Sequence, residues 1–161
     1  MKKSVFATVF AVICFCSYGQ KSSMSSAAQK NLAAARAVVK MFESGDYSKA
    51  GDYIAADAID HSGMGDVKGL DSIKAMFNRM STMMGNFNNQ LIRELADDEY
   101  VFQWLKETST AKTDAMGMKA GQTMTMDAIE VSRFSNGKIV EHWSFLNAAD
   151  AMKMMQSNSM K

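Results

Sequence analysis

The stretch that decides the fold is residues 136–147, NGKIVEHWSFLN. Asn-Gly ahead of a run rich in apolar and aromatic residues is a strong signal for a tight hairpin turn that leads into a β-strand. Successive side chains of a strand point to opposite faces, which gives two sets here: Ile139, Glu141, Trp143, Phe145 and Asn147, and against them Val140, His142, Ser144 and Leu146. Neither set is cleanly polar. We therefore expect both faces of this strand to be covered, one by helices and one by a cavity with scattered polar groups.

The pattern along the rest of the chain changes from helical to strand-like at Gly85. Apolar residues at helical spacing predict helices over residues 27–43, 46–55 and 70–84, with a brief strand over 58–62. After Gly85 the period of two predicts strands over residues 88–96, 100–110, 123–134 and 138–147, followed by a short helix over 148–157. Helices followed by hairpin-linked strands predict an α+β domain, in which a strongly curved antiparallel sheet packs on about three N-terminal helices.

Residues 1–19 have the form of a secretory signal peptide. A basic start is followed by an apolar run over residues 5–15 and by small residues that predict cleavage after Gly19. Cys14 and Cys16 leave with this segment. A bulky residue precedes each of them, whereas lipid attachment needs a small one, so we expect an exported chain, periplasmic or secreted, without a lipid anchor.

The expected mature chain divides into a linker (20–27), one domain (28–150) and a tail (151–161). Loss of Lys2 and Lys3 changes the net charge from +1 to −1, which argues against a nucleic-acid partner or a membrane-surface protein. No cysteine remains, and the two histidines have no third ligand in register, so we predict no metal and no cofactor.

Several pieces of the sequence resemble one family in their order and spacing, from about Leu32 to Asn147. They are FESGD (42–46), YIAAD (53–57), DHS (60–62), Gly69 at the start of the third helix, and RFSNGKIVEHW (133–143). Together they resemble the SnoaL-like, or polyketide-cyclase-like, branch of the nuclear-transport-factor-2-like superfamily. The resemblance implies a cone-shaped α+β barrel with a pocket between the sheet and the helices, and a homodimer formed through the sheet.

The resemblance also bears on function. Enzymes of the family place an acid four positions after the Trp-like site of the last strand, where this chain has Asn147; the hydrolase-like branch uses an Arg and an Asp where this chain has Trp104 and Lys106. An amide can orient a ligand but carries no ionisable proton near neutral pH. We therefore predict a protein that binds a small, largely apolar molecule without the family's catalytic acid, through Trp143, Asn147, Trp104 and His61.

Two alternatives remain open at this stage. In the first the chain is an acid–base enzyme, an isomerase, cyclase or hydrolase, in which His61 or Asp127 replaces the missing acid. Asp127 and Glu130 lie on opposite faces of one strand, so at most one can line a pocket, and His142 is expected on the outer face or at a dimer contact. In the second the sixteen methionines handle copper, since thioethers bind Cu(I).

Export can be tested by the intact mass of the protein isolated from its native host. We expect a soluble chain that begins near Gln20. A mass increase that corresponds to a diacylglyceryl or triacylglyceryl group on Cys16 would contradict this prediction.

Overall fold

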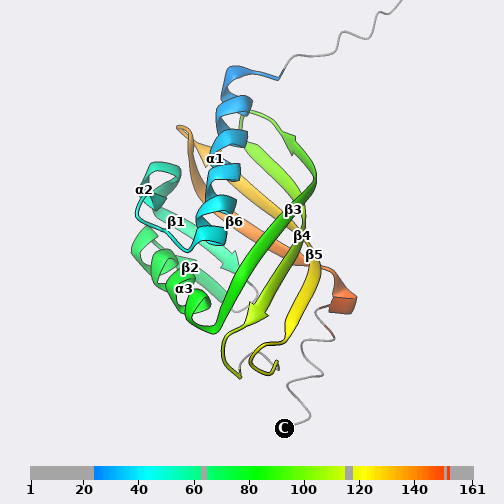
Figure 1. Cartoon of the computed structure of the whole chain (residues 1–161). Helices are drawn as coiled ribbons and strands as arrows, with labels where there is room; N and C mark the ends of the chain where they lie inside the picture. Colours follow the sequence, from blue (N-terminus) through cyan, green and yellow to red (C-terminus); the bar gives the residue numbers. More distant parts are fainter. Residues whose placement is uncertain (1–23, 63–64, 115–117, 151, 153–161) are drawn as a thin grey trace, which may run out of the picture.

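The computed structural model describes residues 24–62, 65–114, 118–150 and 152 (Figure 1). The predicted signal peptide, half of the predicted linker (20–23) and most of the tail lie outside the described residues. The elements follow one another as α1 (Ser26–Ser44), α2 (Ala50–Tyr53), β1 (Ile54–Ser62), β2 (Gly65–Lys68), α3 (Leu70–Met83), β3 (Met84–Ala96), β4 (Tyr100–Ala111), β5 (Thr123–Ser135) and β6 (Lys138–Leu146). None of the helices in these ranges is long and apolar enough to cross a membrane.

The strands form one six-stranded sheet in the order β2-β1-β6-β5-β4-β3. All neighbours are antiparallel except β1 and β6, which run parallel because the chain returns to β1 only after the long β3–β5 meander. Figure 1 shows the sheet curving around the helices, with α1 lying along its concave side. The predicted α+β architecture is confirmed: the curved sheet packs on the helices and remains open rather than closing into a barrel.

The predicted hairpin turn at Asn136-Gly137 is also confirmed. Both residues have a left-handed backbone, with φ of 51° and 75°, as a two-residue turn between twisted strands requires. The pairing that follows is irregular, because Phe134 lies opposite Ile139 whereas Arg133 lies opposite Glu141. One extra residue, Val140, therefore sits in β6 as a bulge.

Three elements begin or end several residues away from the sequence prediction, and one strand was not predicted. The second helix covers only four residues, since the Asp46 carboxylate accepts a hydrogen bond from the Ser48 backbone N–H and forms a turn ahead of it. Ile54 begins β1 instead of continuing that helix, because its backbone pairs with β6 at Ile139. Strand β2 was not predicted, and β3 begins at Met84 rather than at residue 88.

The apolar core lies between the helices and the concave face of the sheet. Small side chains on α1, Ala34 and Ala35, allow this helix to approach Val101 of β4, Phe134 of β5 and Ile139 of β6. A second cluster joins the helices to β1 and contains Met41, Tyr47, Ala50, Ile54, Ala58 and Ile73. These residues define the helix-facing side of the sheet; the opposite side is called the outer face below.

Strand β3 is anchored to α1 at its own irregularity. Its register shifts between Gly85 and Asn88, and Asn86 has a left-handed backbone with φ of 52°. Beyond the shift, the Asn89 backbone N–H donates a hydrogen bond of 2.7 Å to a carboxylate oxygen of Glu43. This charge-assisted bond holds the bent strand against the helix.

Candidate functional site

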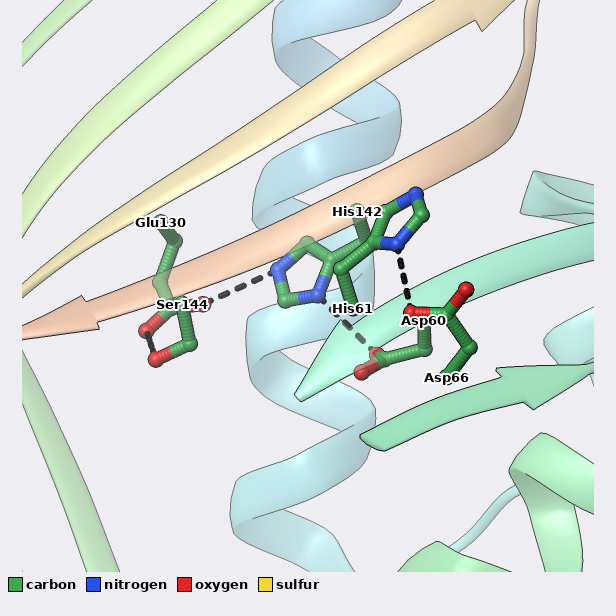
Figure 2. Close-up of polar contacts among 6 residues, drawn as sticks. All are labelled: Asp60, His61, Asp66, Glu130, His142 and Ser144. Atoms are coloured by element: carbon green, nitrogen blue, oxygen red, sulfur yellow. Dashed lines mark hydrogen bonds and ion pairs between the residues drawn. The ribbon is translucent and has the colours of Figure 1, made fainter. Parts of the chain in front are cut away.

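The polar centre of the helix-facing side is His142 of β6. Its Nδ1 lies 3.0 Å from Oδ2 of Asp60, on β1, and its Nε2 lies 2.9 Å from Oε2 of Glu130, on β5. The second carboxylate oxygen of Glu130 accepts a hydrogen bond of 2.7 Å from the hydroxyl of Ser144. Figure 2 shows the imidazole between the two acidic side chains. We call Asp60, Glu130, His142 and Ser144 the His142 cluster.

The bulge at Val140 explains why these side chains meet. Ile139 packs in the helix-facing core, and after the extra residue the alternation restarts with Glu141 on the outer face and His142 on the helix-facing side. On this side His142 is paired with Asp60 across the parallel ladder, and Ser144 is paired with Glu130 across the antiparallel one. Curvature and register thus bring three strands to one point.

The His142 cluster is largely removed from solvent. The side chains of Asp60, Glu130 and His142 are 8%, 13% and 27% exposed. Burial by itself would lower the pKa of His142, but the hydrogen bonds to Asp60 and Glu130 and their negative charges outweigh it and raise the pKa to about 10. At neutral pH His142 is therefore a fixed cation that donates from both ring nitrogens.

A further carboxyl group, Glu107 of β4, belongs to the same electrostatic environment. Burial raises its pKa, the charge of Glu130 raises it further, and the imidazolium of His142 lowers it only in part, which leaves the pKa at about 7. Glu107 therefore exists in both protonated and ionised forms near neutral pH, as proton transfer requires.

A small cavity lies beside the His142 cluster. Its volume is about 30 Å³, enough for one water molecule, and its walls are Val38, Ile54, Ala58, Ile59, Ile73, Phe77 and Ile139 together with Asp60 and His142. It is thus apolar except where the ion pair closes it. A larger hollow of about 340 Å³ lies on the surface near the end of α1, beside Lys40 and Lys49, and contains no residue of the cluster.

Three of the predicted ligand-binding residues lie on the outer face. Trp104 is 46% exposed there. Trp143 stacks on His61, with ring centroids 4.9 Å apart, and Nδ1 of His61 lies 2.9 Å from a carboxylate oxygen of Asp66. The prediction that His142 and Trp143 point to opposite faces is confirmed, but the faces are exchanged: His142 points inward and Trp143 outward. The three residues would not contact a ligand held between the sheet and the helices.

Asn147 and Asp127 also lie away from the cluster. β6 ends at Leu146, and the exposed Asn147 accepts a hydrogen bond of 2.9 Å from the Ala149 backbone N–H, so its amide caps the helical turn that follows. Asp127 lies opposite Lys106 on the outer face, where one of its carboxylate oxygens is buried without a hydrogen-bond partner among the described residues. Of the two acids of β5, Glu130 is the one that faces the helices.

The sequence contains one signal for the site. Glu107, Glu130, His142 and Ser144 are polar residues at strand positions that alternate with clearly outward ones. The direction of this alternation cannot be fixed without the position of the bulge. Asp60 stands out in the sequence only as part of the resemblance.

The family model for the SnoaL-like polyketide cyclase matches residues 32–155 of this chain. No curated protein sequence matches this chain. Among solved structures, a SnoaL-like polyketide cyclase from Agrobacterium tumefaciens is 14% identical, with a TM-score of 0.65 over 78% of this chain and 97% of that one. An LEH-like epoxide hydrolase from M. tuberculosis is 15% identical, with a TM-score of 0.66 over 80% of this chain and 91% of that one. TsrD from Streptomyces laurentii is 10% identical, with a TM-score of 0.69 over 84% of this chain and 99% of that one. At these identities the structures establish a common fold.

The fixed charge of His142 predicts how stability depends on pH. The His142→Ala variant leaves Asp60 and Glu130 facing each other without a cation, and should lower the free energy of unfolding by about 3–5 kcal/mol at pH 7. Because the folded-state pKa is raised, the stabilisation is complete below the unfolded-state pKa near 6.5 and is lost as the pH rises through about 10. The difference between wild type and variant, measured by urea denaturation, should therefore shrink from pH 7 to pH 10.

His61→Ala is the matched control for this measurement. It removes a histidine from the outer face and should cost about 1 kcal/mol. Equal losses for the two variants at pH 7, or a His142→Ala loss that is unchanged at pH 10, would contradict the assignment of a buried imidazolium.

Proposed function

We propose a function from one premise: the chain belongs to the SnoaL-like polyketide cyclase family, whose model matches most of it. On this basis we propose that the chain, exported after cleavage at Gly19, binds a small, largely apolar molecule between the sheet and the helices. We further propose that it changes this molecule by proton transfer, as an isomerase, cyclase or hydrolase. The reacting group of the ligand would lie against the His142 cluster.

The buried His142 cluster is the observation that carries this proposal. Apolar side chains of similar volume would hold three strands together at least as well as a buried ion pair, whose desolvation is costly. Titratable groups with strongly shifted pKa values gather at functional sites. Fixed charges in a water-poor site can also stabilise charge that develops in a transition state, because they are oriented before the reaction begins. The apolar walls of the adjacent cavity favour an apolar ligand.

Binding without turnover is the second candidate. It is favoured by Asn147, which replaces the family's acid and whose side chain is occupied in capping the turn after β6. The same cluster would then orient a ligand by hydrogen bonds and charge alone.

Isotope exchange separates the two candidates. Small neutral ketones in D₂O exchange the hydrogens next to the carbonyl, and NMR would follow this exchange with wild type, Asp60→Asn and Asp57→Asn. We expect wild type and Asp57→Asn, which alters an exposed carboxylate of the same strand, to accelerate the exchange of at least one ketone. Asp60→Asn removes one charge of the cluster and should slow this reaction about tenfold or more. Ketones that bind to the protein without exchange would establish the second candidate instead.

The outer face suggests a partner of a different kind. Exposed apolar side chains lie on four neighbouring strands of this face: Leu95 on β3, Phe102 and Trp104 on β4, Ile129 on β5 and Phe145 on β6. The register places Leu95 opposite Phe102, and Ile129 between Trp104 and Phe145, so the side chains form one patch. We propose that a second copy of the chain covers this patch in a homodimer, because a two-fold axis places the same patch on both subunits.

Sedimentation velocity tests the dimer. Wild type should sediment as a dimer, whereas Phe145→Lys, which places a charge in the patch, should sediment as a folded monomer with an unchanged circular dichroism spectrum. The control is Lys40→Glu, a charge change on α1 and away from the outer face, which should remain dimeric. A monomeric wild type at micromolar concentration would contradict this prediction.

A further inference from the structure

Glu107 has an inward position on β4. In this strand Val101, Gln103 and Leu105 are buried on the helix-facing side, whereas Phe102 and Trp104 are exposed on the outer face. Glu107 is the next residue in this alternation on the helix-facing side, and it is half-buried. Figure 1 shows that this end of β4, together with the adjoining ends of β3 and β5, extends beyond the C-terminal end of α1. Glu107 is paired with Asn89 of β3, whose backbone N–H binds Glu43 near the C-terminal end of α1, so the carboxyl group lies on the concave side where the cover provided by α1 ends.

The other carboxylates of this side are held by partners. Asp60 and Glu130 both bind His142, and the latter also accepts from Ser144. Glu94 of β3 pairs with Arg36 of α1, and Glu43 of α1 accepts the backbone hydrogen bond from β3. Among the described residues Glu107 has no hydrogen-bond or ion-pair partner of this kind. It is the carboxyl group of the helix-facing side that a ligand could engage directly.

We propose that Glu107 is the proton-transfer residue of this site and that its substrate is a neutral molecule with a carbonyl group. This inference rests on the proposed function and deepens it. His142 is held between two carboxylates and cannot give up a proton without leaving one of them without its hydrogen bond and both without a cation, so it acts as a fixed charge. Glu130 is the positioning residue, since it joins His142 to Ser144 and repels negative charge on Glu107.

The charges of the site support this assignment. Two carboxylates and one imidazolium carry a net charge of −1, and Glu107 becomes negative when ionised, so an anionic ligand would be repelled. The pKa of Glu107 near 7 lets the residue take up a proton and return it at neutral pH. In the step itself, ionised Glu107 removes a proton from the carbon next to the carbonyl. The C–H electron pair forms a C=C bond, and the carbonyl π pair moves to oxygen as an enolate. Where the substrate carries a C=C bond beside that carbon, Glu107 returns the proton to the far carbon of this bond as the oxygen pair re-forms the C=O bond and the C=C bond shifts into conjugation, which completes an isomerisation without any oxidant or reductant.

Labelling with diisopropylcarbodiimide tests whether Glu107 is protonated and open to an apolar molecule. This neutral reagent adds to a protonated carboxyl group: the proton moves to one nitrogen of the reagent, and the carboxyl oxygen bonds to its central carbon, without a leaving group. Mass spectrometry of peptides would locate the label after reaction at pH 6 and at pH 8. We expect Glu107 to carry the label, with about a tenfold fall from pH 6 to pH 8 for a pKa of about 7. The exposed Glu99 serves as internal control for labelling that does not depend on the environment of Glu107, and should carry little label.

Two variants complete the test. Glu130→Gln removes a negative charge beside Glu107, which lowers the pKa of Glu107, so labelling at pH 7 should fall. In the ketone-exchange reaction Glu107→Gln should lower kcat about 100-fold or more and change KM little, because the amide fills the same space but carries no proton near neutral pH.

The failure of this inference can be distinguished from that of the proposed function. An absent label on Glu107 at pH 6, or equal labelling at pH 8, would overturn the role of Glu107. If ketone exchange still depended on Asp60, the proposed function would stand with another proton carrier. If no ketone were exchanged while Glu107 was labelled as expected, the catalytic role and the proposed enzyme function would both be overturned.

Discussion

His142 is held between Asp60 of β1 and Glu130 of β5, so one buried cation is shared by three neighbouring strands. The two ion pairs lie on the two sides of β6, one across a parallel ladder and one across an antiparallel ladder. Removal of His142 leaves two carboxylates facing each other without a cation, whereas removal of either carboxylate leaves one ring nitrogen of His142 without its acceptor away from solvent. This interaction fixes the side chains of β6 relative to β1, where the sheet closes through its parallel pair of strands, and it contributes to the potential that Glu107 experiences.

The cluster can exist only because the backbone places β6 in a particular register. Without the bulge at Val140, Ile139 and His142 would lie on opposite faces of the strand, and an apolar core residue and a charged residue could not both face the helices. With the bulge, the core beneath α1 is completed by Ile139, and the polar part of the site begins three residues later. Packing and site are thus adjacent along one strand but do not compete for the same positions. The register shift of β3 between Gly85 and Asn88 is secured separately by Glu43.

The features that the sequence predicted correctly are those with a local cause. The Asn136-Gly137 turn needs left-handed residues at both positions, and the change of period at Gly85 separates helices from strands whatever the tertiary structure. Strand β2 escaped prediction because its four residues, mostly exposed, show no apolar pattern. The predicted face of His142 was wrong because the alternation of side chains shows only which residues share a face. A single extra residue in the strand exchanges the two faces for all residues beyond it. The capping contact of Asn147 could not be predicted for a related reason: its side chain accepts a hydrogen bond from a nearby backbone N–H, which no spacing along β6 reveals.

The same geometry limits where a proton carrier can lie in this chain. On the helix-facing side, β6 offers His142, which is locked as a cation, and Ser144, whose hydroxyl is engaged by Glu130; the strand then ends before Asn147, whose amide turns to the surface. An ionisable group that is free to exchange its proton must therefore come from another strand. The curvature of the sheet carries β4 toward the same interior, so that Glu107 senses both Glu130 and His142 although they lie on different strands. The concave surface, rather than a single strand, defines the site. The His142 cluster can therefore remain the electrostatic centre while a neighbouring strand supplies the residue that moves the proton.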